Sequence, residues 1–468
     1  MRPLLLLLLA TSAAADPASL LDELRRQTGV AGMAASLSID GEVCWHAETG
    51  SADIEARLPV SGETLFRLAS VSKALCSVMA AGLIEDGVID VDTTVGALLP
   101  ELAKQYRELT FRDLMTHTSG LPHYQARDAL RGRKRYSTAI DGLEQLGDRS
   151  LVAEPGDGYL YSTHGFSLAS AMLEAASERT FPELFDDRIA GDIHLEHAIE
   201  GNERRSRLYS GAKREIEPED FSYSWCGAGM AATTIALTDF VSSEFGGSGQ
   251  LGDEGIALLV APLPDRAGRT VDAGRWQMTL GWRRSFDANG DVYLHHAGVT
   301  NGARSIVAVW PDSGKAVALL SNASWTGRME DTAVAFALAD AQAAGNCAVD
   351  GAVDYSGSFG DDAMSATIEW RNTASGCRGG LRGDNALSRW AARFNFGDAD
   401  ELALLRLDEQ RWGLVSPVGI AILSGDINSL TGTVGSRQLT LEQTTGNHGA
   451  RAAAAAAIMR ENKAKNRP

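Results

Sequence analysis

The pattern of apolar and polar positions changes along this chain of 468 residues. Small and apolar residues alternate with polar ones over residues 33–39, which predicts a strand, and Asp40-Gly41 predicts a hairpin turn after it. Apolar residues then recur with the helical period over residues 75–84 and again after Tyr161. This part of the chain therefore opens with a hairpin and continues with helices.

From about residue 276, apolar and polar residues again alternate with a period of two. This alternation predicts strands over residues 292–296, 305–309 and 316–320, followed by a closing helix over residues 331–344. Strands near both ends of this region, with helix-rich sequence between them, favour an α+β fold in which one antiparallel β-sheet is flanked by helices. We therefore expect residues 16–345 to form one large domain.

The sequence after Gly345 consists of short strand-like segments separated by turn residues. These segments lie at residues 366–370, 390–396, 402–407, 412–415, 420–423 and 438–441. Their spacing predicts a C-terminal all-β, barrel-like domain over residues 350–445. The Ala-rich and charged residues 446–468 are typical of a flexible tail.

The first fifteen residues have the three regions of a secretory signal peptide. Arg2 is followed by an apolar run over residues 4–9 and by three alanines at residues 13–15. The run is much shorter than the roughly 20 residues that a membrane-spanning helix needs, so we expect cleavage after Ala15. The mature protein is then expected to be periplasmic or secreted, with no stable membrane insertion.

Net charge, cysteines and histidine spacing indicate which partners, disulfides and metal sites to expect. The formal net charge of −18 disfavours binding to nucleic acid and leaves the oligomeric state open; a small-molecule or peptide substrate is expected as the partner from the resemblance carried by the motifs described next. The five cysteines form no recognisable disulfide framework. Cys76 is expected to be a core residue, and Cys347 with Cys377 is the pair expected if a disulfide forms. His194 and His197 have ligand-like spacing without a third partner, so we expect no metal and no cofactor.

Three short motifs carry the candidate chemistry. Ser70 and Lys73 lie on one face at the start of a predicted helix, so that the amine can reach the hydroxyl and activate it as a nucleophile. Tyr161 opens another helix, and a tyrosine near a lysine can carry protons because the cation favours the phenolate. His296 and Gly298 lie in a predicted strand, where the glycine permits close approach of a substrate backbone.

In this order and at this spacing, the motifs resemble the SxxK, YxN and K/HxG motifs of the serine beta-lactamase and penicillin-binding-protein superfamily. Supporting segments are FRLASVSK, LMTHTSGL, EPGDGYLYSTHGF and VALLSN, and the resemblance spans residues 20–344. Within the superfamily the chain looks closest to class C-like enzymes and to the mitochondrial serine beta-lactamase-like group. The resemblance implies a beta-lactamase/transpeptidase-like catalytic domain over residues 16–345.

The resemblance also implies roles for individual residues. Ser70 would be the nucleophile, and Lys73 with Tyr161 would move its proton. The backbone N–H groups of Ser70 and Val299 would form the oxyanion hole. The substrate-binding residues would be Thr163, His296 and Gly298.

Two departures from the superfamily motifs bear on the substrate. Thr163 replaces an Asn whose amide would bind a substrate amide, and His296 replaces a Lys that would attract a beta-lactam carboxylate. We therefore predict an exported serine hydrolase, a peptidase or esterase with weak or no beta-lactamase activity. The alternative is a catalytically silent binding or sensor protein with the same fold. An α/β-hydrolase esterase is disfavoured, since no G-x-S-x-G pentapeptide occurs.

Three further polar positions stand out in the sequence but are not assigned a role in catalysis. His117, inside LMTHTSGL, is expected to lock a helix end, and Asp239 to cap a helix or face solvent. Asn322-Ala323-Ser324 matches a glycosylation sequon, which a single triplet does not establish.

Overall fold

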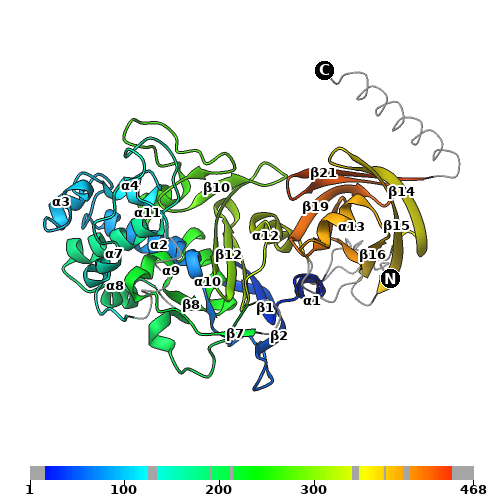
Figure 1. Ribbon diagram of the computed structural model, residues 1–468, viewed down its shortest axis with the longest axis horizontal. Helices are drawn as coiled ribbons and strands as arrows, with labels where there is room; N and C mark the ends of the chain where they lie inside the picture. The colour runs from blue at the N-terminus through cyan, green and yellow to red at the C-terminus, as the bar shows by residue number, and fades with distance from the viewer. Residues whose placement is uncertain are drawn as a thin grey trace, which may run out of the picture. The chain divides into compact units, whose positions relative to one another are not determined.

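The computed structural model describes residues 16–124, 134–189, 191–210, 214–339, 347–373, 376–394 and 401–444 (Figure 1). The described chain divides into two compact units. One is Val30–Ser324, and the other combines the chain from Trp325 onward with the helix that precedes Val30. The expected signal peptide (1–15) and tail (446–468) lie outside the described residues, as does the last part of the helix expected over 331–344.

The Val30–Ser324 unit is built on an eight-stranded antiparallel sheet, which confirms the predicted fold class. The strand order is β3-β2-β1-β13-β12-β11-β10-β9. The predicted hairpin turn is present, with Asp40 and Gly41 both in the left-handed region (φ 51° and 82°) that a tight two-residue turn requires. The strands are β1 (Gly32–Ile39), β2 (Glu42–Asp53), β3 (Leu58–Pro59), β9 (Gln277–Met278), β10 (Arg283–Phe286), β11 (Val292–Thr300), β12 (Ala303–Trp310) and β13 (Lys315–Ser321).

Helices pack against this sheet, and one of them, α2 (Ser72–Glu85), lies among the others (Figure 1). α10 (Thr234–Phe245) packs against β1 and β13, where Thr238 hydrogen-bonds to Ser36 and Ser38 of β1. α2 is buried from Ser72 to Leu83, so side chains at its first turn are held by packing on several sides. The helices in contact with α2 (Ser72–Glu85) or α7 (Thr163–Ser177) are α3 (Val95–Leu98), α4 (Phe111–Met115), α6 (Ala139–Gly142), α8 (Phe181–Arg188), α9 (Trp225–Ala228) and α11 (Asp253–Val260).

A small three-stranded sheet connects the segments that lead to and from the centre of this unit. Its strand order is β4-β8-β5. β4 runs directly into the segment before α2, and β8 follows α9. The strands are β4 (Phe66–Arg67), β5 (Ile193–Leu195) and β8 (Met230–Ala232), and a separate hairpin pairs β6 (Leu208–Ser210) with β7 (Arg214–Ile216).

The second unit contains a closed barrel of eight antiparallel strands, which confirms the expected C-terminal all-β fold. The strand expected at 390–396 is wrong over its described part: residues 390–391 end α13 (Ala386–Ala391), which Asn385 caps by accepting from Ser388 N (2.9 Å), and residues 392–394 form a turn. The strands are β14 (Gly351–Phe359), β15 (Asp362–Thr373), β16 (Gly376–Arg382), β17 (Leu402–Arg406), β18 (Arg411–Ser416), β19 (Gly419–Asp426), β20 (Ser429–Val434) and β21 (Arg437–Gln443).

Two helices that the sequence placed within residues 16–345 group instead with the barrel unit. α1 (Pro17–Thr28) packs on β17, β18 and β19, and its Gln27 Nε2 donates to Glu401 O (2.6 Å). α12 (Met329–Leu338) packs on β19, where Thr332 Oγ1 accepts from Ile420 N (3.1 Å). These buried contacts, which sequence order does not reveal, account for the grouping.

Each unit contains one disulfide. Cys347–Cys377 in the barrel unit confirms the expected pair. Cys76 is fully buried in the core, as expected, but it also forms a disulfide with Cys226 that links α2 to α9, which the sequence did not predict. The helices bring the two Cα atoms to 5.2 Å, within the range that a disulfide spans. Over the described ranges, no helix combines the length and apolar character needed to cross a membrane.

Candidate active site

Ser70 is presented by a tight turn immediately before α2. Ala69 has a positive φ of 49°, a conformation that costs a non-glycine residue roughly 1–2 kcal/mol. The turn is fixed from two sides, because Leu68 N donates to Met230 O (2.9 Å) and Leu68 O accepts from Ser305 Oγ (2.6 Å). Strands β8 and β12 thus hold the strained backbone that directs the Ser70 side chain.

Lys73 is completely buried at the first turn of α2. Its Nζ lies 3.1 Å from Ser70 Oγ, 3.2 Å from Thr163 Oγ1 and 2.7 Å from Gly227 O. Among the residues that the structure describes, no carboxylate forms an ion pair with it. Burial lowers the pKa of Lys73, although the charge of a Tyr161 phenolate acts against this. The amine therefore loses its proton more readily than an ordinary lysine.

Tyr161 contacts Ser70 as well. Its hydroxyl donates to Ser70 Oγ (3.0 Å), and Lys73 Nζ lies 5.1 Å from the centroid of its ring. Burial acts to raise the pKa of Tyr161, but the positive charges of Lys73 and Arg283 outweigh it, and the net pKa is lowered. The structure thus brings the three side chains of the first two motifs together, with Ser70 Oγ hydrogen-bonded to both of the others.

Thr163 lies against Lys73. It is buried at the start of α7, and its Oγ1 is one of the three oxygens around the lysine Nζ. Its methyl group packs on Gly227, where an added Cβ would lie only 2.6 Å from Thr163 Cγ2. Thr163 therefore helps to fix the position of the Lys73 amine by accepting a hydrogen bond from it. Because Gly227 has no side chain, α9 can approach closely enough for the Gly227 carbonyl to accept a second hydrogen bond from the same amine.

His296 is a neutral, fully buried ring on β11. Its Nδ1 hydrogen-bonds to Ala297 O (3.0 Å), and because a carbonyl can only accept, Nδ1 carries the proton. Its Nε2 is buried and has no partner among the described residues. Burial, together with the charges of Arg283 and Lys73, lowers the pKa of His296 well below its usual range. The ring therefore supplies no cation at neutral pH.

Gly298 allows β11 to touch the nucleophile segment. A Cβ at this position would lie 2.4 Å from Ser305 Oγ, 2.5 Å from Leu68 O and 2.9 Å from Ser70 N. The glycine is thus required by the protein's own backbone, a reason that the sequence reading did not include. Val299, the next residue of the strand, is 54% exposed.

Arg283 on β10 is the main site residue that the sequence reading missed. Its Cζ lies 5.6 Å from the ring centroid of Tyr161 and 4.5 Å from that of Trp276. Its charge lowers the pKa values of Lys73 and Tyr161, so it lies within electrostatic reach of both. No carboxylate of the described chain pairs with it, and its Nε is buried without a partner. The available signal was the pair Arg283-Arg284, which follows Trp282 shortly before the motif at His296.

The histidine pair with ligand-like spacing does not form a metal site. His194 Nε2 bonds to Asp192 Oδ1 (2.8 Å), and His197 Nδ1 accepts from Trp225 Nε1 (3.2 Å). Within the described ranges, no group of three or more His, Cys, Asp or Glu side chains could hold a metal ion. Asn322 is fully buried and accepts from Gly32 N (2.8 Å), so its side chain is inaccessible to glycosylation.

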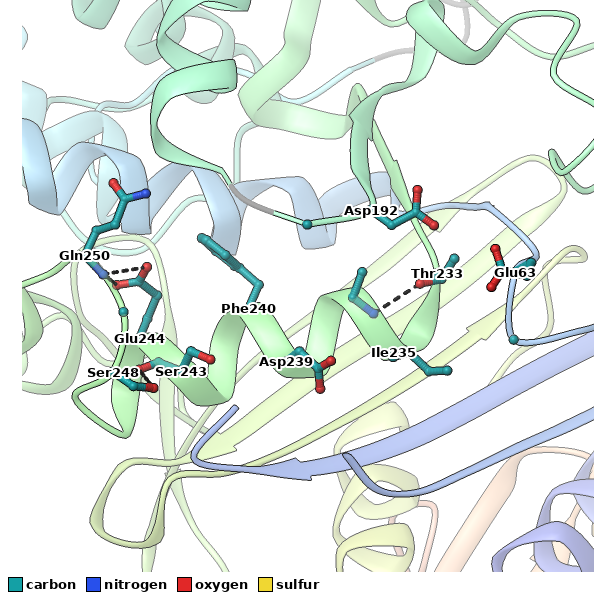
Figure 2. Close-up of a pocket in the computed structure, with 14 residues that line it drawn as sticks. Glu63, Asp192, Thr233, Ile235, Asp239, Phe240, Ser243, Glu244, Ser248 and Gln250 are labelled. Atoms are coloured by element: carbon teal, nitrogen blue, oxygen red, sulfur yellow. Dashed lines mark hydrogen bonds between the residues drawn. The ribbon is translucent and has the colours of Figure 1, made fainter. Parts of the chain in front are cut away.

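A separate pocket of about 600 Å³ lies along α10 (Figure 2). Asp239 lines it from the middle of that helix and accepts from Ser38 Oγ (2.6 Å), while Thr233 caps the helix. Of the two roles expected for Asp239, capping is therefore wrong, whereas its half-buried carboxylate does face the open pocket. None of the residues lining this pocket belongs to the cluster around Ser70. Further lining residues are Glu63, Asp192, Ile235, Phe240 and Glu244.

Known proteins share both the sequence pattern and the fold. The human mitochondrial serine beta-lactamase-like protein LACTB is 24% identical over 389 residues, which cover 63% of this chain and 71% of that protein. Esterase EstB of Burkholderia gladioli is 29% identical over 201 residues, 40% of this chain and 51% of the esterase.

Solved structures agree at the level of the fold. The octameric penicillin-binding protein homologue from Pyrococcus abyssi aligns with a TM-score of 0.59 at 17% identity, covering 91% of this chain and 99% of that one. A class C beta-lactamase aligns with a TM-score of 0.56 at 16% identity, covering 66% and 91%. The family model described as Beta-lactamase matches residues 18–341, well over half of the sequence. The chain therefore belongs to the beta-lactamase family.

Proposed function

We propose that this protein is an exported serine hydrolase that forms an acyl-enzyme on Ser70 and cleaves peptide or ester substrates, with weak or no beta-lactamase activity. The observation that carries the proposal is the placement of Ser70 Oγ between Lys73 Nζ (3.1 Å) and Tyr161 Oη (3.0 Å), two groups whose pKa values are both lowered. Serine becomes a nucleophile only when a neighbour takes its proton. Export is supported by the two disulfides, which are typical of oxidising compartments.

Acylation follows from this geometry. Ser70 Oγ attacks the substrate carbonyl carbon while its proton passes to Lys73 or Tyr161, and the carbonyl oxygen becomes an oxyanion. The backbone N–H groups of Ser70 and Val299 would stabilise that oxyanion, since β11 contacts the Ser70 backbone at Gly298. The bond to the amine or alkoxide leaving group then breaks, and the leaving group departs with the proton.

Deacylation uses the same groups in reverse. A water molecule attacks the ester carbonyl carbon, and Tyr161 accepts a proton from it as general base. The bond to Ser70 Oγ breaks, the proton returns to Ser70, and the acid product leaves. The lowered pKa of Tyr161 supports this role, because a phenolate is more accessible than in an ordinary tyrosine.

Arg283 indicates the substrate class. The Arg283 guanidinium is half-buried beside the ring of Tyr161 and has no carboxylate partner among the described residues, which suits a substrate that carries a carboxylate near its scissile bond. It would supply the cation that the neutral His296 does not. Weak or absent beta-lactamase activity remains part of the proposal, because Thr163 offers no amide where the family motif has Asn.

Intact-mass measurement after incubation with a fluorophosphonate, a carboxylate-bearing ester and a penicillin tests the proposal. The fluorophosphonate adduct is expected on the peptide that contains Ser70, and Ser70→Ala should abolish it. Lys73→Ala and Tyr161→Phe should slow labelling by ~100-fold, the scale of losing a positioned proton acceptor.

The matched control is Ser313→Ala, which removes an exposed serine hydroxyl at the turn between β12 and β13 and should label at the wild-type rate. Circular dichroism of each variant separates loss of chemistry from loss of folding. Labelling that persists in Ser70→Ala, or an intact wild-type protein that takes up no probe, would contradict the proposal and favour a silent binding protein.

A further inference from the structure

The turn after α4 contacts the segment that carries Tyr161 along much of its length. Val152 N donates to Gly120 O (2.8 Å), and Gly156 N donates to Thr118 O (2.8 Å). The approach is close, since a Cβ at Gly120 would lie 2.0 Å from Ala153 O. Hydrogen bonds to the backbone of this one turn therefore fix the path of residues 152–160.

His117 occupies the part of this turn nearest to Tyr161. Its carbonyl oxygen accepts from Leu160 N (2.7 Å), and its Nδ1 accepts from Ser162 N (3.2 Å). The peptide N–H groups on both sides of Tyr161 are thus bound by one residue. The rings of His117 and Tyr161 are also in contact, with centroids 4.5 Å apart.

The conformation of His117 makes these contacts possible. Its φ of 60° turns the chain sharply at the end of α4, so that its carbonyl and its ring both face the Tyr161 segment. Because Nδ1 accepts a hydrogen bond, it is unprotonated, and burial lowers the pKa of His117 well below its usual range. The ring is a neutral acceptor and carries no charge that would take part in catalysis.

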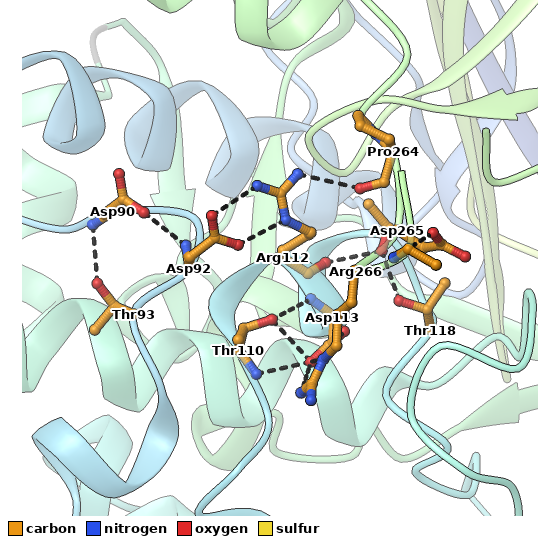
Figure 3. A network of polar contacts seen from close by, with 12 residues as sticks. Asp90, Asp92, Thr93, Thr110, Arg112, Asp113, Thr118, Pro264, Asp265 and Arg266 are labelled. Atoms are coloured by element: carbon orange, nitrogen blue, oxygen red, sulfur yellow. Dashed lines mark hydrogen bonds and ion pairs between the residues drawn. The ribbon is translucent and has the colours of Figure 1, made fainter. Parts of the chain in front are cut away.

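A polar network holds the helix on which this turn depends. Figure 3 shows Asp113, in the first turn of α4, bound by Thr110 and by the guanidinium of Arg266. Asp113 O in turn accepts from Thr118 N (2.9 Å), the residue after His117. Asp113 is completely buried, so the helix and its exit turn form one fixed support.

We propose that His117 is the positioning residue for Tyr161, and that its two acceptor atoms and its ring hold the phenol at hydrogen-bonding distance from Ser70. The inference rests on the proposed function of Ser70 as nucleophile. Tyr161 lies at the end of an irregular segment just before α7, so contacts with its neighbours rather than a regular element hold it; the ring of His123, with its centroid 5.1 Å away, adds a second contact. A displacement of about 1 Å at a reacting group can cost ~100-fold in rate.

Three substitutions at position 117 separate the contributions. His117→Asn keeps an acceptor close to the position of Nδ1 and tolerates positive φ. His117→Gln keeps polarity and length but moves the acceptor away, and His117→Ala removes the side chain. Acylation by a fluorophosphonate should be slowed ~10–100-fold in the Gln and Ala variants and much less in the Asn variant.

Two further measurements make the test specific. In a Tyr161→Phe background, His117→Ala should cost little more, because residues that act through one another are not additive. Absorbance titration of the phenolate, as the difference between each protein and its Tyr161→Phe counterpart, should show the pKa of Tyr161 rising towards its ordinary value in His117→Ala. His197→Ala, which removes a half-buried histidine ring that also accepts a hydrogen bond at Nδ1, is the matched control and should label normally.

Equal rate losses in the wild-type and Tyr161→Phe backgrounds would overturn the inference, as would an unchanged pKa of Tyr161 in His117→Ala. Should His117→Ala fail to fold, the comparison of the Asn and Gln variants decides the question. The phenolate titration needs no enzyme activity. Failure of wild-type labelling would therefore contradict the proposed function and leave the positioning role of His117 to be decided by the titration.

Discussion

Breaking the Cys76–Cys226 disulfide should strongly destabilise the Val30–Ser324 unit. The bond closes a loop with a sequence separation of 150 residues, whereas Cys347–Cys377 closes one of 30. In the chain-entropy description, the lost constraint on the unfolded chain corresponds to about 5 kcal/mol for the longer loop and about 3.5 kcal/mol for the shorter one. We therefore expect the larger loss of stability in the catalytic unit.

Urea unfolding measures this loss. Wild-type protein is compared with and without reductant, which breaks the cross-links but keeps every sulfur atom in place. Cys76→Ala/Cys226→Ala and the matched control Cys347→Ala/Cys377→Ala then separate the two bonds. Fluorophosphonate labelling at each urea concentration reports folding of the catalytic unit, so only the first pair should move that transition to much lower urea.

The same bond bears on catalysis. Cys226 directly precedes Gly227, whose carbonyl accepts from Lys73 Nζ (2.7 Å), and Cys76 lies one helical turn after Lys73. In native buffer the Cys76→Ala/Cys226→Ala protein should therefore label more slowly than the control pair. The reasoning is refuted if reduction leaves the labelling transition unmoved, or if peptide mapping without reduction finds Cys76 as a free thiol.

Two other substitutions test the site directly. Gly298→Ala should slow acylation at least ~100-fold, because the added Cβ would lie 2.9 Å from Ser70 N; labelling at the wild-type rate would show that β11 does not support the nucleophile. Arg283→Gln should move the rising limb of the acylation–pH profile to higher pH. In the wild-type protein the charge of Arg283 lowers the pKa values of both Lys73 and Tyr161. Without that charge both pKa values rise, so each group releases its proton only at a higher pH. An unshifted limb would contradict this reasoning.

Local patterns in the sequence predicted the parts of the site that depend on short spacing. Ser70 and Lys73 meet because they are three residues apart where a short 3-10 turn (Ala69–Val71) runs into α2, and Asp40-Gly41 forms its hairpin because both residues tolerate positive φ. The antiparallel sheet followed from the change of period at about residue 276. In these cases the structure forms for reasons that lie in residues close to one another in the sequence.

Contacts between distant segments were not predictable in this way. Arg283 reaches the site from β10 and Gly227 reaches it from a four-residue helix. Both residues lie outside the three sequence motifs. Cys76 finds Cys226 only after the helices pack. Trp390 sits in an apolar, aromatic stretch that favours a strand, yet the cap at Asn385 makes it part of a helix.

The borders of the two sheets have a consequence for behaviour at high concentration. The outer strands of the eight-stranded sheet, β3 and β9, are each two residues long, and β3 ends in Pro59, which has no N–H to offer. β14 pairs with β21, so the barrel has no free border at all. β3 pairs only with Ser51 and Asp53, however, so within the described chain residues 42–50 of β2 form the longer uncovered edge of this sheet, and any strand-to-strand joining of natively folded copies should begin there.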